Sequence, residues 1–423
     1  MRRACLLLAG AALPLSAARA DEGMWTFDAF PAAKIRAEYG WAPDQAWLDR
    51  VRLASVRLTG GCSSSFVSSE GLILTNQHCV ADCLADLSSP GNDLLAKGYV
   101  AAARNQEKQC PGQQAEVVTA IRDVSPDVKQ AIGSATGEAA VKARTAAIAN
   151  IEKANCPDTV KTRCQVVSLY GGGQYKLYTY RKYSDVRIVW APEDAASKFG
   201  GDPDNYNFPR YALDGSFLRA YEDGRPVATP QHLKWTGREP KEGELIFVVG
   251  NPGSTQRLLT TSQLAYQREV NLPILLATQS ELRGRLLTAI GNDPERQREG
   301  NDKLYSVENN LKRHIGRTKA LNDPAFFGRI AASERDLKAR STGNAAIGDP
   351  WSEIDRAVAA QRQMDTEYRF AQPQGELFAY ALDLVRAGIE RSKPNADRLP
   401  GYSDSALPLL EKELLDPKPI APW

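Results

Sequence analysis

Histidine is scarce in this chain, and one of its three histidines stands in a setting suited to acid–base chemistry. His78 follows a strand-like apolar run in LTNQHCV and is followed by Cys79. A general base needs a ring in a fixed orientation, with its second nitrogen held by a carboxylate. A disulfide at Cys79 would provide that fixation. His232, in TPQHLKW, is interpreted as structural, and His314, in NNLKRHIG, as a surface residue.

A carboxylate partner for His78 is expected in the segment KFGGDPDNYNFPRYALDGSFLRAY, which is dense in Gly, Asp, Asn and aromatic residues. Asp202, Asp204 and Asp214 are all candidates. Ordinary turn formation explains the first two, since Gly-Asp-Pro and Asp-Asn favour loops. Asp214 stands at the mouth of the strand-like SFLRAY, where a carboxylate can be buried and aimed. Position alone favours Asp214 only modestly, and the choice stays open at this point.

A serine nucleophile is not recognisable in the chain. No Gly-x-Ser-x-Gly, Gly-Asp-Ser-Gly or Gly-Asn-Ser-Gly turn occurs. Ser65 in GCSSSF and Ser254 in GNPGSTQR come nearest and are interpreted as strand and turn residues. GNPGS also lacks the Lys-Ser/Thr ending of a phosphate-binding loop. The residues therefore offer a base and an orienting acid without a nucleophile.

The first twenty residues predict export. A basic start, a short apolar run and the small-x-small site Ala18-Arg19-Ala20 occur in the order of a cleaved signal peptide, which would cover residues 1–20. No later stretch is apolar for long enough to cross a bilayer, so no membrane association is expected after cleavage. The 53 Lys and Arg nearly balance the 51 Asp and Glu, and no basic stripe suggests nucleic acid. A periplasmic or secreted protein is therefore predicted.

Six cysteines follow the signal peptide, an even number that predicts disulfides in an exported chain. The connectivity is not fixed by sequence. We favour the pairs Cys62–Cys79, Cys83–Cys110 and Cys156–Cys164, the last closing the short loop NCPDTVKTRC. Without a Cys-x-x-Cys pair or clustered histidines, no metal site is expected, and no cofactor is predicted.

The periodicity predicts a β-rich unit followed by an α-rich one. VRLASVRL and ELIFVVGNPG are typical of strands, and SFVSSEGLILTNQHC predicts a hairpin turning at Ser69-Glu70-Gly71. An alanine-rich stretch near 127–154 predicts a helical insertion. From about Thr255 onward the segments are helical by period and composition, separated by Asn-Asp-Pro, Gly-Asp-Pro and Lys-Pro-Asn.

Long ordered motifs across most of the chain resemble the S46 family of dipeptidyl peptidases, which are exported bacterial enzymes. The similarity lies in DEGMW, SVRLTGGCSSSFVSSEGLILTNQHC, FGGDPDNYNFPRYALDGSFLRAY and FVVGNPGSTQRLLT. The resemblance implies an α+β multidomain protein: the first β-barrel of a chymotrypsin-like double barrel over residues 21–254, then an α-helical cap over 255–423. The cap is expected to be incomplete.

The resemblance also implies roles for individual residues. His78 matches the catalytic histidine, and Asp214 matches the aspartate that orients it. Asn205 matches the asparagine that holds the free N-terminal amine of the substrate, with the aromatic Tyr206 and Phe208 beside it. Gln77 departs from the second histidine that many members carry there, while His78 keeps the role.

The family's serine lies in a second barrel beyond the cap, and that barrel is absent from these residues. We therefore expect a fragment of a dipeptidyl peptidase that acts on peptides with a free N-terminus, and no activity from the fragment alone. One alternative is an exported peptide-binding protein with a degenerate protease fold. A trypsin-like endopeptidase is disfavoured by the amine-anchoring segment and the cap. The oligomeric state stays open, with a homodimer among the options.

Overall fold

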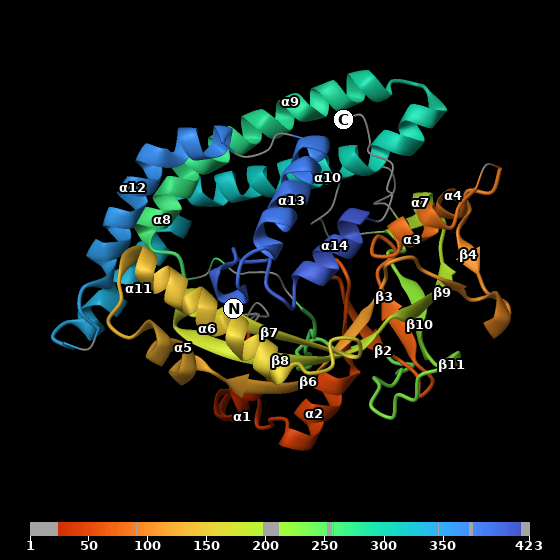
Figure 1. Cartoon of the computed structure of the whole chain (residues 1–423), viewed down its shortest axis with the longest axis horizontal. Coiled ribbons are helices and arrows are strands. Elements are labelled where there is room, and N and C mark those ends of the chain that lie inside the picture. Colours follow the sequence, from red (N-terminus) through yellow and green to blue (C-terminus); the bar gives the residue numbers. More distant parts are fainter. Residues whose placement is uncertain are drawn as a thin grey trace, which may run out of the picture.

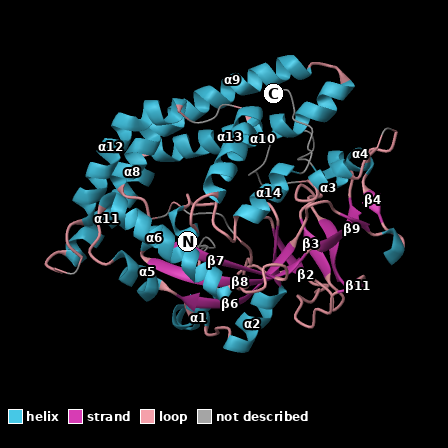
Figure 2. Cartoon of the chain, viewed as in Figure 1, coloured by secondary structure: helices cyan, strands magenta, loops and turns pink. Residues whose placement is uncertain are grey.

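The protein combines one large antiparallel sheet with a set of long helices, an α+β architecture (Figures 1 and 2). The computed structural model describes residues 24–415, apart from 90, 198–210, 252–255, 257, 346 and 372–374. The sheet comes mainly from the N-terminal half, and most of the long helices come from the C-terminal half and lie above the sheet in Figure 1. Within those residues, no helix is both long enough and apolar enough to cross a membrane.

The sheet of the described residues has 11 strands in the order β4-β9-β10-β3-β2-β1-β6-β8-β7, with β11 paired to β10 and β5 to β9. The strands are β1 Ser55–Leu58, β2 Ser63–Phe66, β3 Leu72–Thr75, β4 Tyr99–Val100, β5 Lys108–Gln109, β6 Ala115–Asp123, β7 Thr162–Leu169, β8 Gln174–Tyr183, β9 Asp185–Ala191, β10 Ser216–Glu222 and β11 Arg225–Pro226. All of the pairings are antiparallel.

The β2–β3 hairpin predicted from SFVSSEGLILTNQHC is present, with Phe66 opposite Ile73. Its turn requires glycine at position 71, where φ is +69°. A Cβ there would lie 2.8 Å from the carbonyl oxygen of Ala220 on the neighbouring strand β10. Both Phe66 and Ile73 are buried in the main core cluster, so the hairpin is held from one face by apolar packing.

Several helices flank the sheet: α1 Ala32–Tyr39, α2 Gln45–Ala54, α3 Ala81–Asp86, α4 Leu94–Lys97, α5 Ser125–Ile132, α6 Gly137–Asn155 and α7 Asp194–Ser197. Helices α5 and α6 occupy the alanine-rich stretch and cover the β7–β8 end of the sheet through a second apolar cluster. The strand predicted for VRLASVRL is wrong for its first four residues, because Val51–Ala54 form the last turn of α2. Only Ser55–Leu58 form a strand, β1, which pairs with β2 and β6. Leu48, Val51 and Ala54 are buried at helical spacing, which the short sequence window does not reveal.

The C-terminal helices are α8 Thr261–Tyr266, α9 Leu272–Ile290, α10 Pro294–Asn322, α11 Pro324–Ser341, α12 Pro350–Phe370, α13 Glu376–Arg391 and α14 Leu407–Leu415. The predicted Asp-Pro boundaries mark helix starts. Asp293, Asp323 and Asp349 cap α10, α11 and α12 by accepting main-chain N–H bonds, and proline follows each as the first helical residue. Helices α9 and α10 form the long pair at the top of Figure 1.

The strand predicted for ELIFVVGNPG is wrong for its described residues, Glu244–Asn251. They belong to no strand, and among the described residues no main-chain bond pairs 245–250 with a neighbour. Exposure still alternates: Ile246 and Val248 are 64% and 95% exposed. Phe247 faces inward and packs against Trp47, with ring centroids 5.4 Å apart. The apolar alternation is therefore present, but strand pairing also needs a partner backbone.

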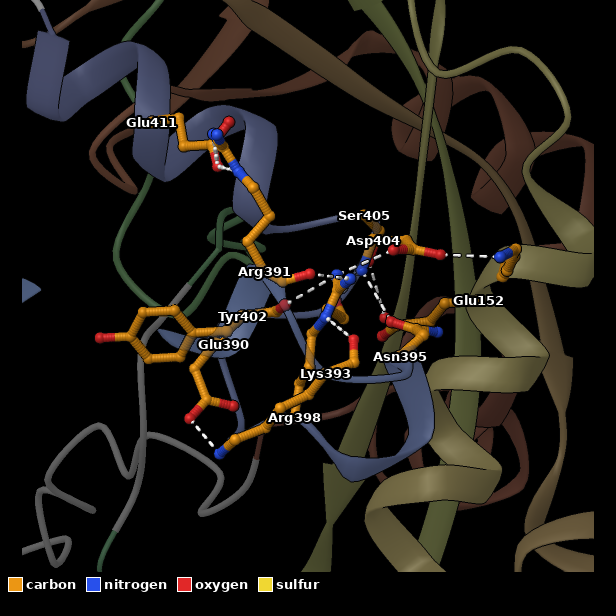
Figure 3. Close-up of polar contacts among 12 residues, drawn as sticks. Glu152, Glu390, Arg391, Lys393, Asn395, Arg398, Tyr402, Asp404, Ser405 and Glu411 are labelled. Carbon is orange, nitrogen blue, oxygen red and sulfur yellow. Dashed lines mark hydrogen bonds and ion pairs between the residues drawn. The ribbon is translucent and has the colours of Figure 1, made fainter. Parts of the chain in front are cut away.

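A polar contact joins helix α6 to the loop between α13 and α14 (Figure 3). Lys153 Nζ lies 2.7 Å from Asp404 Oδ2, and Ser405 Oγ donates to Glu152 Oε2 at 3.0 Å. Arg398 Nη1 lies 2.8 Å from the other oxygen of Asp404. These bonds attach the last described helices to the β-rich half at a second place, far in sequence from the connection near residue 255.

The stability that this contact provides is expected to depend on pH, because Glu152 is a buried carboxyl group. Burial raises the pKa of its carboxyl, although N–H and O–H donors from Val166 and Ser405 oppose the shift. A raised pKa means that the associated stability is present at acidic pH and is lost as the pH rises past the carboxyl's ordinary value. The free energy of unfolding of Glu152→Gln should therefore be about 1 kcal/mol higher than that of the wild type at pH 7.5. At pH 4 the two free energies should be equal.

Urea unfolding at pH 4 and pH 7.5 measures this difference. Glu138→Gln, an exposed change in the first turn of the same helix, is the matched control and should not raise the free energy of unfolding at either pH, because a negative charge there favours the helix. A Glu152→Gln protein that is less stable than the wild type at pH 7.5 would contradict the prediction.

Candidate active site

The pairing of β3 with β10 brings the two predicted site segments together. Ser216, the first residue of β10, is opposite Thr75, the last residue of β3. His78 lies three residues beyond Thr75, and Asp214 lies two residues before Ser216. Because the strands are antiparallel, the end of β3 lies beside the start of β10. His78, which follows β3, and Asp214, which precedes β10, are therefore close together.

His78 and Asp214 form a hydrogen-bonded pair. His78 Nδ1 lies 2.9 Å from Asp214 Oδ2 and 3.1 Å from Oδ1, and the main-chain N–H of His78 donates to Oδ1 at 3.2 Å. The side chain of His78 is 61% exposed, whereas that of Asp214 is only 14% exposed. With Nδ1 bonded to the carboxylate, Nε2 is left on an exposed ring as the nitrogen able to accept a proton.

Disulfides hold the histidine end of the site. Cys79, next to His78, is bonded to Cys62 at the start of the β2–β3 hairpin, with Cα atoms 6.2 Å apart. Cys83 in α3 is bonded to Cys110 just after β5. The third bond, Cys156–Cys164, joins the end of α6 to β7. These three pairs are the ones favoured from the sequence.

Asn76 belongs to the same cluster and was not singled out from the sequence. Its side-chain Nδ2 donates to the carbonyl oxygen of Asp214 at 3.0 Å and to Asp214 Oδ2 at 3.2 Å. Its partner lies 138 residues away in sequence, so the local pattern of TNQHC does not reveal the contact. The chain turns directly after Asn76, where Val80 N–H donates to the carbonyl oxygen of Gln77 at 2.9 Å, and the side chains of Asn76 and His78 both contact the Asp214 carboxylate.

Some predicted residues lie outside the part of the chain that the structure describes. They are the amine-anchor candidates Asn205, Tyr206 and Phe208, the alternative carboxylates Asp202 and Asp204, and Ser254.

The remaining candidates have structural settings. Ser65 is paired within β2, and His232 Nδ1 contacts the carbonyl oxygen of Thr229 at 3.0 Å. The surface placement predicted for His314 is wrong, because the residue is 4% exposed on α10. Helix α10 packs along α9, and burial lowers the pKa of the His314 imidazole.

The described residues contain one cluster with metal-ligand atoms in reach, formed by Cys62, His78 and Cys79. Thiolate is the form of cysteine that binds metals. Both sulfurs are bonded to each other here, so the cluster does not offer a metal site.

Residues 20–423 match the model of the peptidase S46 family. This chain belongs to the peptidase S46 family. Among curated relatives, it is 29% identical to an Asp/Glu-specific dipeptidyl-peptidase of Shewanella putrefaciens, covering 96% of this chain and 58% of the relative. It is 28% identical to dipeptidyl-peptidase 7 of Porphyromonas gingivalis, covering 96% and 62% respectively.

Solved structures show the same fold for this S46 chain. DPP11 of Porphyromonas endodontalis in complex with the dipeptide Arg-Glu superposes with a TM-score of 0.76 at 23% identity, over 93% of this chain and 60% of that one. The same protein in complex with Arg-Asp gives a TM-score of 0.74. This S46 chain thus spans about three fifths of the length of these relatives.

Gln77, between Asn76 and His78 in this S46 chain, is completely buried. Neither its amide nitrogen nor its amide oxygen has a hydrogen-bond partner among the described residues. A buried amide without partners costs roughly 1–3 kcal/mol. Gln77 is therefore expected to lower the stability of the fold, at the position where the resemblance implies histidine in many relatives.

Gln77→Met is expected to raise the free energy of unfolding by about 1 kcal/mol, because it keeps the volume and removes the unpaired polar atoms. Chemical unfolding measures the change. Gln113→Met is the matched control, since the Gln113 amide donates to a carbonyl at 3.1 Å and should not gain stability when replaced. A loss of more than 1 kcal/mol in Gln77→Met would show that the buried amide is hydrogen-bonded in solution.

Proposed function

We propose that this chain is the histidine- and aspartate-bearing part of a serine-type dipeptidyl peptidase. The observation that carries the proposal is the His78–Asp214 pair, with Nδ1 on the carboxylate and the ring exposed. Membership of the S46 family and relatives named as dipeptidyl-peptidases support it.

His78 acts as the general base of the proposed reaction. A serine hydroxyl attacks the peptide carbonyl while His78 Nε2 takes its proton, then passes that proton to the leaving amine. Asp214 keeps Nδ1 protonated and stabilises the imidazolium that forms. The proposal includes a serine that we do not recognise among the 423 residues of this sequence.

Release of dipeptides requires that the free N-terminal amine be held two residues from the scissile bond. We assign that role to Asn205, with Tyr206 and Phe208 beside it. They lie in the segment that leads to Asp214, so anchoring the amine and orienting the base would depend on one stretch of chain. Fixing the amine sets the register of cleavage.

We further propose two structural units, a first chymotrypsin-like barrel over 21–254 and a helical cap over 255–423, and export of the chain with a signal peptide at 1–20. Helices α8 to α14 follow residue 255, which supports the boundary. Three disulfides support an oxidising compartment, because such bonds persist mainly in exported proteins.

The test compares two proteins from the source DNA: residues 21–423, and whatever product the reading frame encodes when sequenced past the codon for Trp423. Each protein is incubated with a peptide carrying a free N-terminus and with the N-acetylated form of the same peptide. The products are identified by mass spectrometry. We expect dipeptides only from the free peptide, and only with a product that supplies the serine. No turnover is expected from residues 21–423.

Two results would overturn the proposal. Equal cleavage of the acetylated peptide would indicate an endopeptidase. Turnover by residues 21–423 alone would mean that the nucleophile lies within them and that the assigned roles need revision.

A further inference from the structure

The amide of Asn76 bonds to Asp214 at two points. One Nδ2 hydrogen goes to the main-chain carbonyl oxygen at 3.0 Å and the other to carboxylate Oδ2 at 3.2 Å. Both atoms of Asp214 are acceptors only, so the nitrogen of the amide must face them. Because the two bonds join the backbone and the side chain of one residue, they restrict rotation of the Asp214 carboxylate relative to its own main chain.

The same carboxylate oxygen also accepts from the histidine. Asp214 Oδ2 lies 2.9 Å from His78 Nδ1, and Oδ1 accepts the main-chain N–H of His78 at 3.2 Å. A carboxylate that receives donors from two directions has one preferred orientation. Asn76 is partly buried directly after β3, so its own position is set by the sheet.

We propose that Asn76 is a positioning residue, whose amide holds Asp214 in the orientation that keeps the proton of neutral His78 on Nδ1. This inference rests on the proposed function, since it deepens the role of the His78–Asp214 pair. Asn76 acts through Asp214 and takes no part in bond making.

The consequence is a defined tautomer of His78. In a neutral imidazole only one nitrogen carries the proton, and the hydrogen-bond acceptor at the ring decides which. With Asp214 held in place, Nδ1–H is favoured and Nε2 keeps its lone pair. If the carboxylate turns away, Nδ1–H loses its acceptor and the Nε2–H tautomer gains population.

Nitrogen-15 NMR of the full 423-residue chain tests this directly. The chain has only three histidines, and the His78 signals are assigned by their loss in His78→Ala. At a pH near 9, where imidazoles are neutral, wild-type His78 should show the shifts of the Nδ1–H form. Asn76→Leu, of similar shape without a donor, should raise the ratio of Nε2–H to Nδ1–H roughly threefold to tenfold.

A second variant and a matched control separate positioning from general damage. Asn76→Asp keeps the size but sets an oxygen against Asp214, so it should shift the ratio in the same direction. The control is Gln45→Leu, which removes an amide-to-aspartate bond of 3.2 Å to Asp49, an exposed bond on α2, and should leave the ratio unchanged. Unchanged His232 signals verify the fold in each variant.

A wild-type tautomer ratio in a folded Asn76→Leu or Asn76→Asp protein would overturn the proposal. If both variants unfold, hydrogen exchange of the wild type decides. The Asn76 amide protons should exchange more slowly than those of Gln45, and equal rates would overturn the proposal. The NMR result needs no serine and no turnover, so it can fail while the peptidase assay succeeds, and the reverse.

Discussion

Replacing His78 with alanine should reduce turnover by at least about 10⁴-fold in a product of this reading frame that carries the serine, with little change in KM. In the proposed mechanism the ring is the base that takes the proton of the serine, and its removal leaves the residues assigned to bind the peptide amine in place. Initial rates of dipeptide release over a range of peptide concentrations separate kcat from KM.

Asp214→Asn is the companion change and should cost about 10⁴-fold in kcat, because an amide can donate to His78 Nδ1 and so favour the wrong tautomer. His232→Ala is the matched control, since His232 contacts the carbonyl of Thr229 and lies outside the pair. It should leave kcat within about twofold. A His78→Ala protein that retains more than a tenth of the wild-type rate would exclude His78 as the base.

Local patterns sufficed to predict the histidine end of the site. Apolar alternation followed by Cys79 predicted a strand with a fixed histidine, and β3 ends three residues before His78, with Cys79 bonded to Cys62. The Asp-Pro boundaries of the long helices were equally local, because capping and the fixed φ of proline act within one turn.

The choice among the candidate carboxylates needed more than local sequence. The register of β10 on β3 places Asp214 beside His78, although the two residues are 136 apart in sequence. Asn76 was missed for the same reason, since its role depends on the same cross-strand neighbour. Register is set by the packing of both strands at once, so the sequence of one strand does not reveal it.

Two segments were wrongly predicted to be strands, for related reasons. Val51–Ala54 continue a helix although β-branched and apolar residues favoured a strand, because the buried face of α2 extends into them. Residues 245–250 keep the alternation of a strand but have no partner among the described residues. In both segments the neighbours, and not the local propensity, decide the outcome.

Removing the Cys62–Cys79 disulfide by replacing both cysteines with alanine should lower the free energy of unfolding by about 3 kcal/mol. The two residues are 17 apart in sequence, and a loop of this length gives a loss of that size in the chain-entropy description. The bond also anchors the residue next to His78, so His78 should lose its fixed orientation toward Asp214.

The Cys156–Cys164 pair provides a matched control for this prediction. Its loop spans 8 residues, so the same double replacement should cost about 2.5 kcal/mol by the same relation. That bond joins α6 to β7 and does not touch the His78–Asp214 pair. Urea unfolding measures both losses, and the tautomer of His78 near pH 9 measures orientation. Because the two losses in stability are similar, a tautomer change in the Cys62–Cys79 variant alone would separate positioning of the site from stabilisation of the fold. An equal tautomer change in both variants would contradict that separation.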